Sequence, residues 1–132
     1  MVRLLIVDDY PQIREMLATY FSEFTAEFEV VATAGNGQEA LELVRLQRPD
    51  AVLMDIVMPI MDGIRATRTI TSEFPATVVI TYTSHSDPDL CALARAAGAA
   101  HHIFKPFDFL RLKEEVLQCV RTGRADAERG SR

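Results

Sequence analysis

Short apolar runs alternate with stretches of helical spacing five times along these 132 residues, and this alternation constrains the fold more than any other feature. A strand that is joined to the next strand through a helix returns to the sheet in parallel, by a right-handed crossover. The runs predict strands at Arg3–Val7, Phe28–Ala34, Ala51–Met54, Thr77–Tyr82 and Ala100–Phe104. The sequence therefore predicts one α/β domain with a parallel sheet between layers of helices.

Capping and breaking residues mark where the intervening helices begin and end. Pro11 suits the first turn of a helix, where its missing N–H group is not needed. Asn36 with Glu39 three residues later resembles a capping box, and Asp62 suits an N-cap. Gly98 ends the fourth predicted helix. The third helix has the weakest pattern, because it contains three threonines, which are poor helix formers.

Composition is typical of a soluble globular protein. Hydrophobic residues make up 48% and charged residues 25% of the sequence, and no apolar stretch approaches the roughly 20 residues of a membrane helix. The net charge of −5 argues against a nucleic-acid surface. Cys91 and Cys119 lack metal-ligand spacing and indicate buried thiols in a reducing compartment. We expect a cytoplasmic domain over residues 1–121 and a polar tail or linker over 122–132.

Polar residues stand directly after four of the predicted strands. Asp8 and Asp9 follow the first strand, and Asp55 follows the third. Thr83 follows the fourth strand and Lys105 the fifth. The carboxyl ends of parallel strands lie at one edge of a sheet, where ligands bind in open α/β folds. The chain order therefore predicts three carboxylates, a hydroxyl and an ammonium group at one edge, a set that suits a divalent cation and a phosphoryl group.

Each member of this set has a chemical interpretation and a plainer structural one. The adjacent Asp8 and Asp9 repel each other unless a cation lies between them, and they would select Mg²⁺ or Mn²⁺; otherwise they cap a helix. Asp55 would be a nucleophile that carries an aspartyl-phosphate, or a solvated residue at a strand end. Thr83 and Lys105 would contact phosphoryl oxygens, or be a strand-end residue and a surface lysine. A cis Lys105–Pro106 bond would turn Lys105 toward the site.

Five motifs, in this order and spacing, resemble the receiver domain of bacterial two-component response regulators. The resemblance covers about residues 2–121, nearly the whole chain. It implies a flavodoxin-like (βα)₅ fold with strand order 2-1-3-4-5 and helices on both faces. The motifs are Leu5-Ile6-Val7-Asp8-Asp9, residues 54–63 (Met-Asp-Ile-Val-Met-Pro-Ile-Met-Asp-Gly), Tyr82-Thr83-Ser84, Ala97-Gly98-Ala99 and Lys105-Pro106-Phe107.

The resemblance also implies how the site works. Asp55 would accept a phosphoryl group from a histidine kinase or phosphotransfer protein. The side chains of Asp9 and Asp55, with the Val57 carbonyl, would bind Mg²⁺ or Mn²⁺. Asp8 would act mostly through ordered water. Such a domain assists its own Mg²⁺-dependent phosphorylation and dephosphorylation but is not a turnover enzyme, and homodimerisation is possible for it.

For the output, the resemblance implies a switch. Thr83 and Lys105 would contact the phosphoryl oxygens, and Thr83 would move inward and reshape the face of the fourth helix, fifth strand and fifth helix. A downstream protein or an output domain would recognise that face. The family usually has Tyr or Phe three residues before the lysine, where this chain has His102 beside His101. Burying an imidazolium is costly, so we predict a weaker or pH-sensitive switch; the alternative is a mostly exposed histidine without a switching role.

Other function classes fit the residues less well. A pseudo-receiver that binds a partner without phosphorylation would not need the intact acidic residues, Thr83 or Lys105. A phosphohydrolase with an aspartyl nucleophile would want a second acid at Val57. A flavin-binding domain would want a Ser/Thr-rich loop after the first strand, where this chain has Asp8 and Asp9. Val57 and His85, two residues past Asp55 and Thr83, leave the acyl-phosphate lifetime open.

Overall fold

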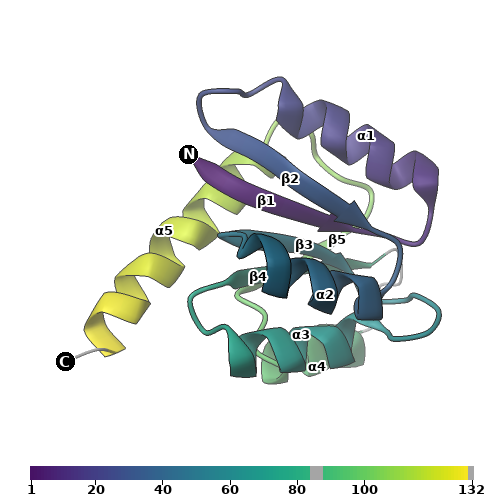
Figure 1. Cartoon of the computed structure of the whole chain (residues 1–132), viewed down its shortest axis with the longest axis vertical. Helices are drawn as coiled ribbons and strands as arrows, with labels where there is room; N and C mark the ends of the chain where they lie inside the picture. Colours follow the sequence, from purple (N-terminus) through teal and green to yellow (C-terminus); the bar gives the residue numbers. More distant parts are fainter. Residues whose placement is uncertain (84–87, 131–132) are drawn as a thin grey trace.

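The computed structural model describes residues 1–83 and 88–130 and places them in five strands and five helices (Figure 1). The strands form one parallel sheet in the order β2-β1-β3-β4-β5. The fold class and strand order that the sequence predicts are therefore confirmed. Along the chain, the elements are β1 (Val2–Val7), α1 (Pro11–Ser22), β2 (Phe28–Ala34), α2 (Gly37–Gln47), β3 (Ala51–Asp55), α3 (Gly63–Glu73), β4 (Val78–Thr83), α4 (Pro88–Ala96), β5 (His101–Phe104) and α5 (Leu112–Gly130).

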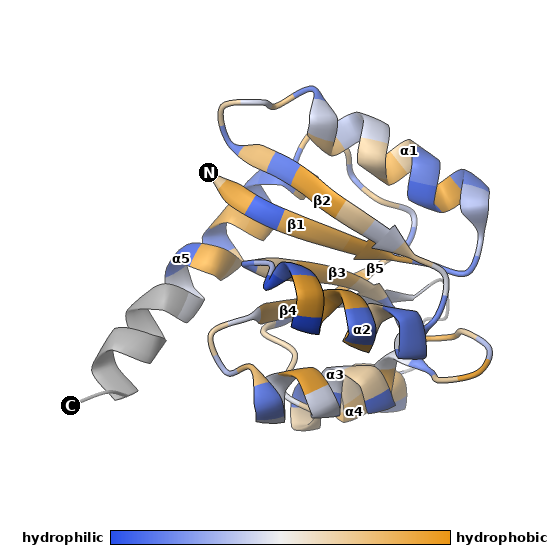
Figure 2. Cartoon of the chain, viewed as in Figure 1, coloured by the Kyte–Doolittle hydropathy of each residue, from blue (hydrophilic) through white to orange (hydrophobic). Residues whose placement is uncertain are grey.

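The sheet lies between two layers of helices. Helices α1 and α5 cover one face, and α2, α3 and α4 cover the other (Figure 1). The central strands are hydrophobic along most of their length, as is typical of a parallel sheet buried on both faces (Figure 2). Leu17 and Phe21 of α1 pack with Leu112 of α5 in one core, while Val44 of α2 and Ile70 of α3 pack in the other. Successive residues of a strand therefore point into different cores.

The predicted helix starts are confirmed. Pro11 is the first residue of α1, the side chain of Asn36 accepts the N–H of Glu39, and the side chain of Asp62 accepts the N–H of Arg65. Helix α3 forms despite its threonines because its apolar face, including the fully buried Ala66 and Ile70, packs against the sheet. Packing energy of this kind routinely outweighs intrinsic helix propensity. The hydroxyls of Thr69 and Thr71 donate to carbonyls of the preceding turn.

The end of the chain differs from the predicted polar tail. The backbone of α5 continues as a helix to Gly130, well past the last apolar core residue, Val120. Arg, Ala and Glu, which are good helix formers, make up much of residues 121–130, and they extend a helix that is already anchored by packing. None of the described helices combines the length and the apolar character that a membrane span requires. His85 lies outside the described residues.

The two cysteines are more accessible than the sequence predicts. Cys91 on α4 and Cys119 on α5 are both free thiols, and both are partly exposed rather than buried. Each lies at the margin of an apolar helix face, where the periodicity does not distinguish full burial from partial burial.

Candidate functional site

The carboxyl ends of β1 and β3 bring three aspartates together. Asp8, Asp9 and Asp55 each offer a carboxylate oxygen, and these oxygens lie within 4.8 Å of one another. Asp8 is fully buried and Asp55 is 5% exposed, so water does little to separate their charges. The predicted acidic cluster at this sheet edge is therefore present. Like charges held this close favour a bound cation or a proton.

Asp8 is held on both of its carboxylate oxygens. Oδ1 accepts the backbone N–H of Tyr10 at 2.8 Å, and Oδ2 accepts the hydroxyl of Tyr82 at 2.7 Å. The Lys105 ammonium lies 3.7 Å from Oδ2. From α1, the Arg14 guanidinium donates to the Asp8 carbonyl at 2.6 Å. Asp8 is thus the most constrained member of the cluster.

Asp9 differs from Asp8 in the hydrogen bonding of its carboxylate. Its Oδ1 is buried and has no hydrogen-bond partner in the part of the chain that the structure describes. A buried carboxylate oxygen without a donor is costly, whereas a cation would satisfy it. Hard carboxylate oxygens are also the ligands that Mg²⁺ and Mn²⁺ prefer. The residues present therefore fit the predicted divalent metal.

The environment of Asp55 favours its neutral form when no cation is bound. Burial, and then the charge of Asp8, raise the pKa of Asp55 from 3.8 to about 7, while Lys105 lowers it, Asp9 raises it, and a hydrogen bond from the Val57 backbone lowers it. A bound cation would replace the proton as the charge partner of this carboxylate. The protonation state of Asp55 therefore depends on whether a cation is bound beside it.

Lys105 lies at the site, as the sequence predicts. The Lys105–Pro106 peptide bond is cis, and only 19% of the Lys105 side chain is exposed. Its backbone N–H donates to the Thr83 carbonyl at 3.0 Å, which ties the end of β5 to the end of β4. The ammonium also lies 5.0 Å from the centre of the Tyr82 ring. This placement leaves the Lys105 ammonium beside the carboxylates, in a 3.7 Å ion pair with Asp8.

Thr83 and Val57 occupy opposite environments. Thr83 ends β4 and is 1% exposed, whereas Val57 follows β3 and is 49% exposed. The loop that carries Val57 is pinned by Gly63, whose N–H donates to the Ile56 carbonyl at 2.8 Å. A Cβ at Gly63 would collide with the Asp55 carbonyl oxygen, so the helix start can approach the site only with glycine there.

Comparison with known proteins assigns the chain to a family. Residues 4–117 match the response regulator receiver domain. This chain belongs to that family. Transcriptional regulatory protein LnrK of Bacillus subtilis is 41% identical over 105 residues, covering 80% of this chain and 47% of LnrK. Transcriptional regulatory protein PdtaR of Mycobacterium tuberculosis is 45% identical over 105 residues, covering 80% of this chain and 50% of PdtaR.

Solved receiver domains share the fold. The signal receiver domain of the response regulator NarL from Mycobacterium tuberculosis superposes with a TM-score of 0.85 at 32% identity, covering 91% of this chain and 96% of that domain. The chain spans about half the length of the curated relatives it matches. The receiver domain is the part shared with those regulators.

The histidine of this receiver domain that stands at the expected switch position is buried. His102 is 5% exposed, and a hydrogen bond of 2.7 Å joins its Nδ1 to the Thr81 hydroxyl. Its Nε2 is buried and has no partner among the described residues. The expectation of a mostly exposed histidine is wrong, because β5 pairs with β4 so that His102 stands opposite Thr81. Burial, His101 and Arg95 lower the pKa of His102.

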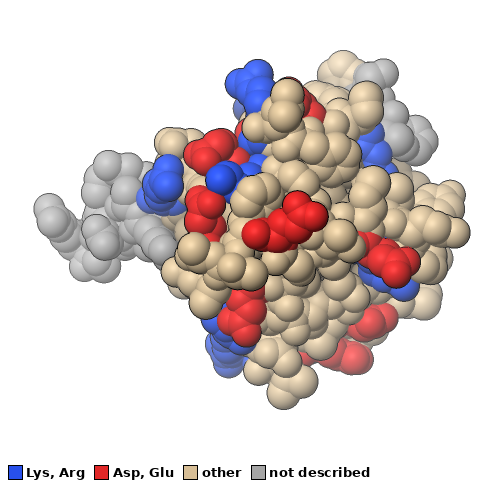
Figure 3. Space-filling model, turned by 90° about the horizontal axis from the view of Figure 1, so that it is seen from above, with Lys and Arg blue, Asp and Glu red and all other residues tan. Residues whose placement is uncertain are grey.

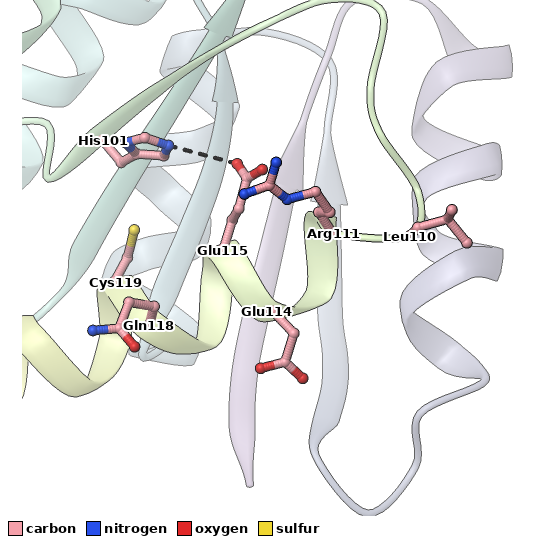
Figure 4. A pocket seen from close by; sticks show the side chains of 7 residues that line it. All are labelled: His101, Leu110, Arg111, Glu114, Glu115, Gln118 and Cys119. Carbon is pink, nitrogen blue, oxygen red and sulfur yellow. Dashed lines mark ion pairs between the residues drawn. The ribbon is translucent and has the colours of Figure 1, made fainter.

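The surface beside His102 contains a hollow between β5 and α5 (Figure 4). His101 and Glu115 form an ion pair of 3.5 Å across it, and the Cys119 thiol faces it from α5. Burial, and then Glu115, raise the pKa of Cys119 to about 11, so this thiol stays protonated. This hollow belongs to the face that the resemblance links to output.

Charges are mixed on the face seen from above in Figure 3. Among the residues described there, acidic and basic side chains are interspersed with uncharged ones and form no continuous basic patch. Nucleic-acid surfaces are typically basic stripes or patches. This face of the receiver domain therefore lacks that signature.

Sequence reasoning missed one residue of the site, Tyr82. Its hydroxyl donates to Asp8 and lies 3.1 Å from the Val7 carbonyl, and the ring is fully buried. The signal was available, since a tyrosine stands in the strand directly before Thr83. Periodicity assigns such a ring to the core, and it does not show that the hydroxyl reaches the aspartates across the sheet.

Proposed function

We propose that this receiver domain accepts a phosphoryl group on Asp55 from a phosphohistidine of a histidine kinase or phosphotransfer protein. The observation that carries the proposal is the cluster of three carboxylate oxygens within 4.8 Å, with the Lys105 ammonium 3.7 Å from one of them. One buried oxygen of Asp9 in this cluster lacks a partner, which supports a role for a cation. In an acidic cluster with a structural role alone, we would expect this buried oxygen to accept a hydrogen bond.

The reaction would be an in-line transfer. The electron pair of the phosphorus–nitrogen bond stays with the donor imidazole, and an Asp55 oxygen forms the new phosphorus–oxygen bond. Asp55 must be deprotonated to attack, which the Lys105 charge favours. When bound, Mg²⁺ supplies positive charge that offsets the charge of the carboxylates and the phosphoryl oxygens. We propose Asp9, Asp55 and the Val57 carbonyl as its ligands, with Asp8 acting through water.

Lys105 and Thr83 would hold the transferred group. The Lys105 ammonium has no contact shorter than 3.7 Å with Asp8, so it can turn to a phosphoryl oxygen at little cost. Thr83 ends the neighbouring strand, and its hydroxyl would be the second donor to the group. The two donors would stabilise the charge that builds up during the transfer.

The output would pass through His102. The side chain is already buried beside Thr81, so an inward movement of Thr83 meets an imidazole that is held in place. We propose that phosphorylation shifts the balance between this packing and another that changes the α4–β5–α5 face, as a population shift that a partner recognises. That partner would be a downstream protein or an output domain, and the receiver domain itself would not bind nucleic acid.

A mostly apolar groove beside Lys105 would receive the phosphodonor. Ile13 and Met16 of α1 face Pro106, Phe107 and Phe109 of the loop after β5. A phosphohistidine carried on a helix could lie here with its ring directed at the site. We expect Met16→Glu to slow transfer from a phosphohistidine protein but not from acetyl phosphate, and Leu46→Glu, at an exposed position of α2, to slow neither.

The test is the intact mass of the protein after incubation with acetyl phosphate and Mg²⁺. We expect one phosphate adduct in the parent, none in Asp55→Asn, and none in EDTA. Asp108→Asn is a matched control, because Asp108 is exposed and an asparagine keeps the oxygen that accepts the Leu110 N–H. The absence of an adduct in the parent, with both acetyl phosphate and a phosphohistidine donor, would instead identify a pseudo-receiver that binds its partner without phosphorylation.

A further inference from the structure

Among the residues that the structure describes, Tyr82 is an aromatic residue whose side chain hydrogen-bonds to the acidic cluster. It sits on β4, opposite Asp55 in the pairing of β3 with β4, and its ring is fully buried. Its hydroxyl lies 2.7 Å from Oδ2 of Asp8 and 3.1 Å from the Val7 carbonyl. Both neighbours are acceptors, so the hydroxyl is the donor, and its shorter bond goes to the carboxylate.

The Tyr82 ring also lies near Lys105. The Lys105 ammonium lies 5.0 Å from the centre of the Tyr82 ring, a distance at which a cation is attracted to an aromatic face. The ammonium lies 3.7 Å from the Asp8 oxygen that Tyr82 already satisfies. The two donors therefore share one acceptor, and the hydroxyl makes the shorter contact.

We propose that Tyr82 is a positioning residue, whose hydroxyl holds Asp8 in its orientation toward the metal and keeps Lys105 available for the phosphoryl group. This inference rests on the proposed function, because it assigns Tyr82 a task in that site. Without the hydroxyl, Oδ2 of Asp8 would have Lys105 as its remaining polar neighbour among the contacts described. Lys105 would then form a closer ion pair with Asp8, and the carboxylate would turn with it.

Metal affinity reports this role directly. Side chains that orient a carboxylate near a metal commonly change affinity by about 10-fold or more when they are removed. We expect Tyr82→Phe, which keeps the ring and removes only the hydroxyl, to weaken Mn²⁺ binding by about tenfold. The measurement is a Mn²⁺ titration followed by electron paramagnetic resonance, and it requires no phosphorylation.

Tyr20→Phe is the matched control. The Tyr20 hydroxyl donates to the Phe109 carbonyl at 2.9 Å and accepts the Lys113 N–H at 3.0 Å, so its removal also costs two hydrogen bonds, but away from the aspartates. We expect this variant to lose thermal stability while its Mn²⁺ affinity stays within twofold of the parent. If Tyr82→Phe folds poorly, as judged by near-ultraviolet circular dichroism, Tyr82→Leu provides a second variant without the hydroxyl.

A double-mutant cycle tests whether Tyr82 acts through Asp8. In an Asp8→Asn background, Tyr82→Phe should weaken Mn²⁺ binding by less than twofold, because the carboxylate that it positions is gone. Equal Mn²⁺ affinity of the parent and Tyr82→Phe would overturn the proposal, and so would the same tenfold loss in both backgrounds. Failure of the proposed function looks different, since the parent would then form no Asp55 adduct.

Discussion

The imidazole Nδ1 of His102 lies 2.7 Å from the Thr81 hydroxyl, and the two side chains stand opposite each other on β5 and β4. The bond holds a buried titratable ring of β5 against Thr81, which lies two residues before Thr83 at the end of β4. A hydrogen bond to a buried ring stabilises one rotamer of the side chain relative to the others. The position at which the resemblance places a switch residue is therefore occupied by a group with a defined hydrogen-bond partner and a lowered pKa.

We predict that His102 makes the domain less stable in mild acid. Its pKa is lowered from 6.5, so in the folded state the ring stays neutral at pH values where the unfolded chain is protonated. The stability linked to neutral His102 is fully present above pH 6.5 and is lost as the pH falls from there through the lowered pKa of the folded state. At pH 8, His102→Phe should be less stable than the parent by about 1 kcal/mol, because Thr81 loses its partner. Urea unfolding at pH 8 and pH 5.5 should show this gap closing in acid.

The control for this prediction is Thr77→Val. The buried Thr77 hydroxyl donates to the Pro49 carbonyl at 3.2 Å and does not titrate, so its removal should cost the same stability at pH 8 and pH 5.5. A constant difference between His102→Phe and the parent at both pH values would contradict a buried neutral His102. The role in output is tested separately, by comparing partner affinity of phosphorylated parent and His102→Tyr at pH 6 and pH 8. Equal affinities throughout would remove His102 from the switch.

We predict that neutralising Asp55 stabilises the metal-free protein at alkaline pH. The pKa of Asp55 is raised from 3.8 to about 7, so the folded state holds a proton that the unfolded state has released between these values. The stability linked to this proton is present below pH 3.8 and is lost as the pH rises through about 7. In EDTA at pH 8, Asp55→Asn should be more stable than the parent by a few kcal/mol, on the order of 1.4 per pKa unit.

The same comparison at pH 5 supplies the control, because Asp55 is then neutral in the folded parent. Here the two proteins should differ by much less in their urea midpoints. An advantage of Asp55→Asn that is equally large at pH 5 and pH 8 would show that Asp55 is not protonated in the folded state.

We predict that Mg²⁺ stabilises the parent through Asp9. A ligand at a hundredfold excess over its dissociation constant adds about 2.7 kcal/mol to the free energy of unfolding. The melting temperature of the parent should therefore rise with Mg²⁺, more at pH 8 than at pH 6, since the metal competes with the Asp55 proton. Asp9→Asn should abolish most of this shift, whereas Glu29→Gln, at an exposed position of β2, should keep it. An undiminished shift in Asp9→Asn would place the metal elsewhere.

We predict that Lys105→Ala slows phosphorylation without preventing metal binding. Loss of one donor to the developing charge typically costs about 100-fold to 1,000-fold in rate. The initial rate of adduct formation from acetyl phosphate should fall by about this factor at saturating Mg²⁺. Lys113→Ala is the comparison, because Lys113 pairs with Glu27 at 2.9 Å, away from the site. A Lys105→Ala rate within threefold of the parent would show that this ammonium does not contact the phosphoryl group.

We predict that Gly63→Ala damages the site through the backbone. The added methyl group would meet the Asp55 carbonyl oxygen and the backbone of Ile56, neither of which can move without displacing the end of β3. Overpacking of this kind typically costs about 1–3 kcal/mol. Urea unfolding should show that loss, and Mn²⁺ affinity should fall with it. Gly35→Ala is milder, because its new methyl group would meet only flexible side chains.

The strands, caps and acidic cluster were predictable because each follows from a local pattern. Asp62 caps α3 through its own side chain, and Asp55 reaches the sheet edge because a parallel strand ends there. Three other features were not predictable, because they depend on contacts between residues that are distant in the sequence. The Tyr82 hydroxyl meets Asp8 across 74 positions of sequence, and the burial of His102 depends on Thr81, 21 positions away. The continuation of α5 past Val120 depends on a helix that packing had already started.

Neighbouring residues of β4 make hydrogen bonds on opposite faces of the sheet. Tyr82 points toward the core under α1 and α5, on the side of the aspartates, whereas Thr81 bonds to His102 on the opposite side. A shift of β4 by one residue would exchange these directions, because side chains of a strand alternate. The tyrosine would then lie under the helices α3 and α4, and a threonine too short to reach Asp8 would take its place. A one-residue insertion in β4 would thus break the Tyr82–Asp8 and the Thr81–His102 hydrogen bonds together, even if the sheet itself survived.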